Sequence, residues 1–353
     1  MTAPSTPPSP TPPSPSQRSR RLSTRQRVVI TVAALAVLAA GTGITLGLTR
    51  HAGDTKADTT RTAATASGVD TSAQQSGRVR ISEVPAAVAA LKDSGFSPVH
   101  KGELTVATTG GSAPLSFTAD DGSTLIGSEV DVAQLIADGL GLKLRVEATS
   151  WADWPLGAQS GKYDLVLSNV GVTEERKDLF DFATYRHGLH SFLVRKDSDL
   201  SELSSPADIA GLKIVVGSGT NQEKILQAWN KINEKAGRKS ATLVYYDDAA
   251  ASLLALRSGR VDASLGPNPS QIYQAQISDD LKVVGRINAG WPDNSDVGAV
   301  TKKGDGLIHP VQLVLTSAQT SGKLTESLKR WGLQGEEVPT IQVNPKGLPR
   351  ATK

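Results

Sequence analysis

Short β-branched runs alternate with amphipathic stretches and glycine-containing turns after Lys101. Strand-like runs lie at 104–108, 142–148, 163–169, 212–218, 242–247 and 261–266. Helical spacing covers 129–141, 220–237 and 249–259. Strands that alternate with helices in this way are typical of βαβ units. Two such units of about ninety residues each predict an α/β fold with two lobes and a cleft between them.

An apolar run without a charged residue covers 28–48, ahead of the α/β region. As a helix that rises ~1.5 Å per residue, this run is long enough for a hydrocarbon core of ~30 Å. Five arginines precede the run and Arg50 and His51 follow it, which places the N-terminus in the cytosol and the remainder outside. A cleaved signal peptide is the alternative, although the run is long for one. We therefore expect a single-pass anchor in the cell membrane.

The charge and the cysteine content of the chain exclude several classes of function. Six arginines lie in the first fifty residues, and without them 32 basic residues face 35 acidic ones. A nucleic-acid-binding face is therefore not expected. The chain has no cysteine, which excludes disulfides, thiolate metal ligands, a cysteine nucleophile and a lipid-modified cysteine. Patterns of hydrolases, zinc proteases and P-loop proteins are also absent, so no cofactor is expected.

Five short segments carry a specific order of residues, at 127–131, 159–166, 173–182, 217–223 and 256–263. Thr173, Glu175 and Arg176, followed by two phenylalanines, form the third of them. Together the segments resemble the bacterial extracellular solute-binding proteins of family 3, the polar amino-acid type that serves ABC importers. The resemblance covers roughly 101–333. It implies a monomer with a two-lobed, periplasmic-binding-protein-like (type II) fold, whose lobes close on the ligand before it docks on an ABC permease.

The organisation expected on this basis has one membrane helix ahead of the two-lobed fold. Its parts are a disordered cytosolic tail at 1–27, a transmembrane anchor or signal segment at 28–49, a flexible linker at 50–80, an opening helix within 81–100, a first lobe at 101–194 that is completed by 291–335, a second lobe at 195–290, and a C-terminal tail at 336–353. The hinge is expected near 192–196 and before Val297.

The resemblance also implies the ligand site. The expected binding residues are Thr109, Glu129, Trp151, Ser168, Asn169, Gly171, Thr173, Arg176, Thr220, Asn221 and Asn268. A guanidinium such as that of Arg176 can bind a carboxylate with two parallel hydrogen bonds. Thr220 and Asn221 begin a predicted helix, where free N–H groups favour an anion. Three structural alternatives stay open: a solvated Arg176, an ordinary helix cap at Thr220, and a Trp151 that only packs in the core.

Several positions depart from the pattern of this family. Pro267 stands where an aspartate commonly holds the ligand's ammonium group, and Thr109 replaces another common acid. Gly171 stands where serine is frequent. Glu129, Asp293 or Asp296 could supply the missing negative charge, and Glu129 is slightly favoured because it opens a helix near the first-lobe wall. The alternatives to a transport protein are a ligand sensor for a partner protein and a dehydratase-like enzyme.

Overall fold

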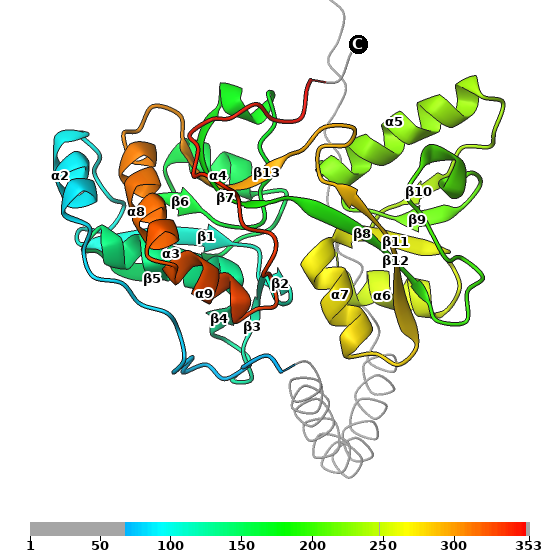
Figure 1. The fold of residues 1–353 in the computed structure, drawn as a ribbon, viewed down its shortest axis with the longest axis horizontal. Helices are drawn as coiled ribbons and strands as arrows, with labels where there is room; N and C mark the ends of the chain where they lie inside the picture. Colours follow the sequence, from blue (N-terminus) through cyan, green and yellow to red (C-terminus); the bar gives the residue numbers. More distant parts are fainter. Residues whose placement is uncertain (1–67, 247, 351–353) are drawn as a thin grey trace, which may run out of the picture. The chain divides into compact units, whose positions relative to one another are not determined.

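Two five-stranded sheets organise residues 68–246 and 248–350, which are the residues that the computed structural model describes (Figure 1). The first sheet has the order β5–β1–β6–β13–β7, the second β10–β9–β11–β8–β12, and a small third sheet β2–β3–β4. The strands are β1 (Glu103–Thr108), β2 (Gly111–Ser112), β3 (Ser116–Thr118), β4 (Leu125–Ile126), β5 (Lys143–Ala148), β6 (Leu165–Val166), β7 (Phe180–His187), β8 (Leu189–Arg195), β9 (Lys213–Val215), β10 (Thr242–Val244), β11 (Ala263–Pro267), β12 (Leu281–Asn288) and β13 (Asp296–Lys302). The helices are α2 (Pro85–Asp93), α3 (Ser128–Gly139), α4 (Trp154–Ser160), α5 (Asn221–Lys235), α6 (Ala249–Arg257), α7 (Asn268–Gln276), α8 (Ile308–Thr320) and α9 (Lys323–Lys329).

Helices cover both faces of the first sheet, and its central strands contribute apolar residues to the cores on both sides. In β13, Val297 and Ala299 belong to the core that α3 and α8 share. The next residue, Val300, turns to the opposite face and packs in the core that contains Trp154 of α4. This alternation follows from the two-residue period of a strand. The resemblance implied that the C-terminal part would complete the first lobe, and β13 indeed joins the first sheet.

The second sheet is built in the same way from different helices. Phe192 of β8 stacks near Trp229 of α5, with ring centroids 6.2 Å apart. Its neighbour Leu193 faces the other side and packs with Leu256 of α6. α5 packs in the core on one face of this sheet, and this packing fixes the position of the helix. Because β9 leads into α5, the start of this helix lies at the carboxyl end of strand β9 in the second sheet.

The chain crosses between the two sheets at Gly188 and again at 289–295. We call 68–187 with 296–350 the first lobe and 189–288 the second lobe. β7 and β8 belong to different sheets and Gly188 alone separates them. A Cβ atom at Gly188 would collide with the carbonyl oxygen of Ser295, so the two crossovers touch where this side chain is missing. The crossover expected at 192–196 is therefore corrected to Gly188, because 192–195 lie inside β8.

Both ends of the described chain pack on the first lobe. Arg78 donates to Asp131 of α3 at 2.7 Å, and Val79 is buried, so the expected linker ends before these residues. At the other end, Val343 and Leu348 form isolated β-bridges with Ala183 and Thr173. The segment 336–350, expected as a tail, thus extends the first lobe beside β7.

The expected membrane helix over 28–49 lies outside the described residues, as do the cytosolic tail 1–27 and most of the linker. Within 68–246 and 248–350, no helix is both long and apolar enough to cross a membrane.

Candidate ligand-binding site

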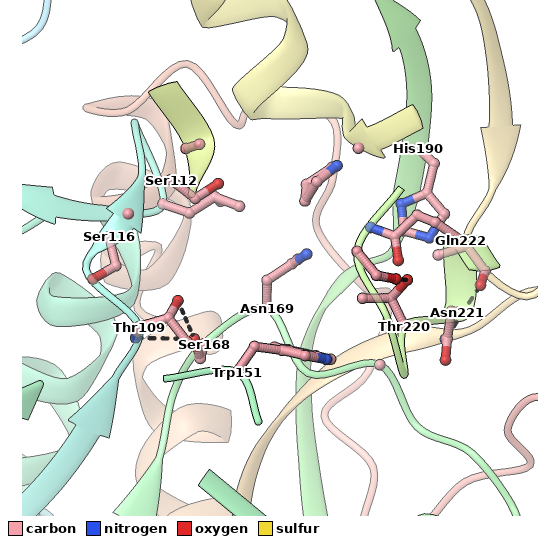
Figure 2. Close-up of a pocket in the computed structure, with 18 of the residues that line it drawn as sticks. Thr109, Ser112, Ser116, Trp151, Ser168, Asn169, His190, Thr220, Asn221 and Gln222 are labelled. Carbon is pink, nitrogen blue, oxygen red and sulfur yellow. Dashed lines mark hydrogen bonds between the residues drawn. The ribbon is translucent and has the colours of Figure 1, made fainter. Parts of the chain in front are cut away.

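A cavity of about 620 Å³ lies between the lobes and is lined by residues of both (Figure 2). The expected site residues that line it are Thr109, Glu129, Trp151, Ser168, Asn169, Gly171, Arg176, Thr220 and Asn221. Thr173 and Asn268 do not line it. The sequence-based assignment therefore brings most of its residues to one place, while their role in binding stays a prediction.

Arg176 spans the cleft from the first lobe. Its Nη1 donates to the carbonyl oxygen of Gly171 at 2.9 Å, and its Nη2 to that of Gly219 in the second lobe at 3.3 Å. The guanidinium also lies 5.4 Å from the ring centroid of Trp151. Burial lowers the pKa of Arg176 to about 10, which leaves the group charged at neutral pH. Thr173 supports Arg176 from behind, because its Oγ1 accepts the backbone N–H of Arg176 at 3.0 Å.

The start of α5 forms the second-lobe wall. Thr220 caps the helix, since its Oγ1 accepts from the backbone N–H of Glu223 at 3.2 Å and donates to the carbonyl oxygen of Gly217 at 2.6 Å. Asn221 follows, and its Nδ2 donates to the carbonyl oxygen of Ala289 at 3.3 Å. Thr220 is therefore both the N-cap of α5 and part of the cavity wall. The helix N-terminus directs its partial positive charge toward the cleft, where it would favour a negatively charged group.

Gly171 faces Asn221 across the cleft. A Cβ atom at position 171 would lie 2.8 Å from Nδ2 of Asn221 and 2.8 Å from Oγ of Ser295. Serine, which is frequent at this position in the resembling family, would collide with both. The departure at Gly171 is thus explained by the close approach of Asn221.

Part of the opposite wall, on the first lobe, carries hydroxyl groups. The hydroxyl groups of Thr109 and Ser168 form a hydrogen bond with an oxygen–oxygen distance of 2.7 Å. The backbone N–H of Thr109 also donates to Oγ of Ser168 at 3.1 Å. Figure 2 shows this pair together with Ser116 on the first-lobe side, facing His190, Gln222 and Thr220 across the cavity. Asn169 projects between the two walls in the same view.

Glu129, the favoured source of a negative charge, belongs to a buried network at the edge of the cavity. Tyr185 donates to its Oε2, and Arg186 donates to its Oε1 at 3.2 Å. Arg186 also donates to Glu336 at 3.0 Å and to Asn169. Burial opposes the charge on Arg186, but the two glutamates outweigh it and raise the pKa of Arg186 above its usual value. Both carboxylate oxygens of Glu129 are thus already hydrogen-bonded inside the protein.

Asn268 connects this network to the second lobe. Its Nδ2 donates to Glu336 at 3.1 Å, and its Oδ1 accepts from Ser191 at 2.5 Å. Two further contacts join the lobes, between Ser112 and Ser270 at 2.7 Å and between Lys224 and Glu175 at 2.5 Å. Asn268 therefore holds the lobes together instead of facing the cavity.

The two other acids considered for the ammonium group lie elsewhere. Asp296 pairs with His187 at 2.8 Å, and Asp293 lies 3.7 Å from Lys346. Neither lines the cavity. Asp248, which the sequence-based assignment missed, does line it. Its Oδ1 caps α6 by accepting the backbone N–H of Ala251 at 2.7 Å, and the signal was an acid just before an alanine-rich helical stretch.

His190 is the second missed residue of the cavity lining. It is 4% exposed, and neither ring nitrogen has a hydrogen-bond partner among the described residues. Burial lowers the pKa of His190 to about 3, so the imidazole is neutral at physiological pH. In the described parts of the chain no group of three or more His, Asp or Glu could hold a metal ion. No pattern in the sequence marked His190 as a cavity residue, because its position depends on strand pairing.

Comparisons with known proteins identify the family and support the two-lobed fold. Residues 104–334 match the family model of bacterial extracellular solute-binding proteins, family 3. L-cystine-binding protein TcyJ of Escherichia coli is 30% identical over 66% of this chain and 83% of its own. L-cystine-binding protein TcyA of Bacillus subtilis is 28% identical over 67% of this chain and 83% of its own. A solved amino acid ABC transporter substrate-binding protein from Streptococcus pneumoniae, bound to L-arginine, is 28% identical with a TM-score of 0.58, and the match covers 71% of this chain and 99% of that one.

Proposed function

Because the chain belongs to family 3 of the bacterial extracellular solute-binding proteins, we propose that it captures an amino acid or an amino-acid-like carboxylate for an ABC importer. The observation that carries this proposal is the position of Arg176 and the N-terminus of α5 on opposite walls of one cavity. A guanidinium and free backbone N–H groups that converge from two lobes form a carboxylate site. The relatives named for amino-acid binding support the same ligand class.

The two halves of this carboxylate site lie on different lobes, and this arrangement provides a way to capture the ligand. Arg176 and Gly171 belong to the first lobe, and Thr220 and Asn221 belong to the second. A carboxylate between them is fully bound only when the lobes are together. The ligand therefore favours the closed arrangement, which is the form that an importer would recognise.

Replacement of Arg176 by alanine tests the carboxylate site. We expect the variant to lose roughly 2–5 kcal/mol of binding free energy, because a desolvated carboxylate loses its charged partner. Isothermal titration calorimetry with the twenty standard amino acids and L-cystine would first identify the ligand, and the variant would then be titrated with it. Arg145→Ala is the matched control, since Arg145 is a half-exposed arginine of β5 that does not line the cavity. Affinity close to that of the unmodified protein in Arg176→Ala would remove Arg176 from the site.

We further propose that the apolar run over 28–48 anchors the protein in the membrane, with the two-lobed part outside the cytosol. The support is its length, its lack of charge and the arginines before it. Full-length protein produced in bacteria should stay in the membrane pellet after a carbonate wash and should keep its N-terminal sequence. A soluble product that begins after the apolar run would show cleavage instead.

A further inference from the structure

Among the residues that the structure describes, four buried side-chain atoms in the cavity lining have no hydrogen-bond partner. They are Nδ1 and Nε2 of His190, Oδ1 of Asn221 and Oγ of Ser116. Leaving such atoms unpaired costs roughly 1–3 kcal/mol each, which makes them candidates for ligand contacts. Three of the four belong to the second lobe, where the N-terminus of α5 already supplies donors for the ligand's carboxylate. The atoms of His190 and Asn221 are therefore available for the rest of the ligand.

His190 lies beside the position of the missing acid. β8 and β11 run antiparallel, and His190 is directly opposite Pro267 in their register. Residues directly opposite in such a pair project from the same face with Cβ atoms ~4.5–5.5 Å apart. The imidazole thus projects into the region that an aspartate at 267 would serve. Figure 2 shows His190 at the second-lobe wall beside Gln222.

The charge states of the wall make it an acceptor for hydrogen bonds. A neutral imidazole keeps one nitrogen as an acceptor, and burial together with the nearby Arg186 guanidinium opposes its protonation. The amide of Asn221 has a fixed orientation, because the Ala289 carbonyl can only accept and therefore faces Nδ2. Oδ1 of Asn221 is then the second acceptor. An ammonium group offers three donors and no acceptor, which complements this pair.

The acids at the cavity are otherwise occupied. Of the described residues that line it, Glu129 and Asp248 carry carboxylates. Both oxygens of Glu129 accept from Tyr185 and Arg186, so this acid is fully hydrogen-bonded inside the protein. Asp248 uses Oδ1 to cap α6, and because the residue is exposed, solvent can satisfy the rest of its carboxylate. The buried atoms of His190 and Asn221, by contrast, have no partner among the described residues.

We propose that His190 binds the ligand's ammonium group through an uncharged acceptor in place of a second-lobe aspartate. The inference rests on the proposed function, and it specifies the ligand as a free α-amino acid. The ammonium charge is balanced at longer range, because Glu129 and Glu336 outnumber the single Arg186 between them in the adjoining network. Arg176 balances the ligand's carboxylate on the other side.

Two pairs of probes test this inference in the full-length protein. L-cystine is compared with 3,3′-dithiodipropionic acid, which lacks both of its α-amines, and L-arginine with 5-guanidinopentanoic acid, which lacks its single α-amine. His190→Leu removes the acceptor and retains a side chain of similar size, and His190→Gln retains an acceptor. Calorimetry measures binding, and thermal unfolding checks that each variant is folded.

The unmodified protein should prefer the amino acid of at least one pair. In His190→Leu the affinity for that amino acid should fall roughly 10- to 100-fold, as expected for a hydrogen bond to a charged group, while the des-amino acid binds nearly as before. His190→Gln should keep most of the preference.

Several results would overturn the inference. The unmodified protein could bind both members equally in both pairs. For the pair with a preference, His190→Leu could lose affinity equally for both members or show no loss, or the preference could be lost in Glu129→Gln alone. If neither L-cystine nor L-arginine binds, the inference also fails, whereas the proposed function fails only when no amino acid of the full panel binds.

Discussion

A side chain at position 171 would occupy the space that Asn221 and Ser295 fill in this protein. The glycine therefore allows the second lobe to bring an amide, instead of a first-lobe hydroxyl, to the proposed carboxylate site. Asn221 Nδ2 is held there by Ala289 and by Ser295, whose Oγ lies 3.3 Å away. The polar group at this point of the cleft has in effect moved from one lobe to the other.

Gly171→Ser tests this relation. The added atoms would push against Nδ2 of Asn221 and Oγ of Ser295, and such overpacking typically costs about 1–3 kcal/mol. Because the strain arises only where the lobes meet, it should appear as a loss of ligand affinity with little change in the stability of either lobe. Gly77→Ser is the control, since a Cβ atom there meets only Arg330 at an ordinary 3.8 Å. Calorimetry measures the ligand affinity of both variants. Unchanged affinity in Gly171→Ser would contradict the close approach of Asn221.

The sequence placed a residue at the cavity where that residue sits inside a local pattern, whereas its role in binding stays a prediction. Arg176 follows Thr173 at a fixed spacing, and the structure shows the physical reason, because Thr173 accepts the backbone N–H of Arg176. Glu129 was placed at the cavity edge, but its ion pair with Arg186 spans distant elements and no local pattern shows it. His190 was missed for the same reason. Its place depends on the pairing of β8 with β11, and its chemistry on burial.

At the scale of elements, the strands and helices with a clear period were predicted well. The run 212–218 contains β9, and the stretch 220–237 contains α5 with its cap at Thr220. The crossover was placed too late because β7 and β8 form an almost continuous strand-like segment, in which a single glycine changes the sheet. Hydrophobic period alone cannot show that change, since both strands are buried on both faces. The close contact of Gly188 with Ser295 is a three-dimensional constraint.

α5 shows how an element serves stability and binding together. Trp229 and its neighbours on one face fill the core of the second lobe, which fixes the helix axis. The same packing fixes the position of its first turn, so that Thr220 and Asn221 reach the cavity without a mobile loop. Orientation by a buried helix face reduces the entropy lost on binding, because the binding groups are already ordered.

The whole molecule depends on contacts that cross the cleft. Lys224–Glu175, Ser112–Ser270 and Asn268–Glu336 join the lobes directly. The first of these pairs is partly exposed and contributes little, whereas Asn268 and Glu336 are buried. In the part of the chain that the structure describes, two crossovers connect the lobes covalently, and a ligand in the cleft would add a further link to the three contacts above. The balance between open and closed arrangements should therefore follow ligand occupancy.

Distance measurements between the lobes test this coupling. The chain has no cysteine, so Lys143→Cys in β5 and Lys231→Cys in α5 would carry the only two spin labels in the full-length protein. Saturation with the ligand identified by calorimetry should shift and narrow the distance distribution between the labels, because the ligand favours the closed state. A pair within the first lobe, Lys92→Cys and Lys143→Cys, should not change. Arg176→Ala in the labelled protein should shift the distribution back at equal ligand concentration. An inter-lobe distribution that stays the same on saturation would rule out closure as the means by which the ligand is captured.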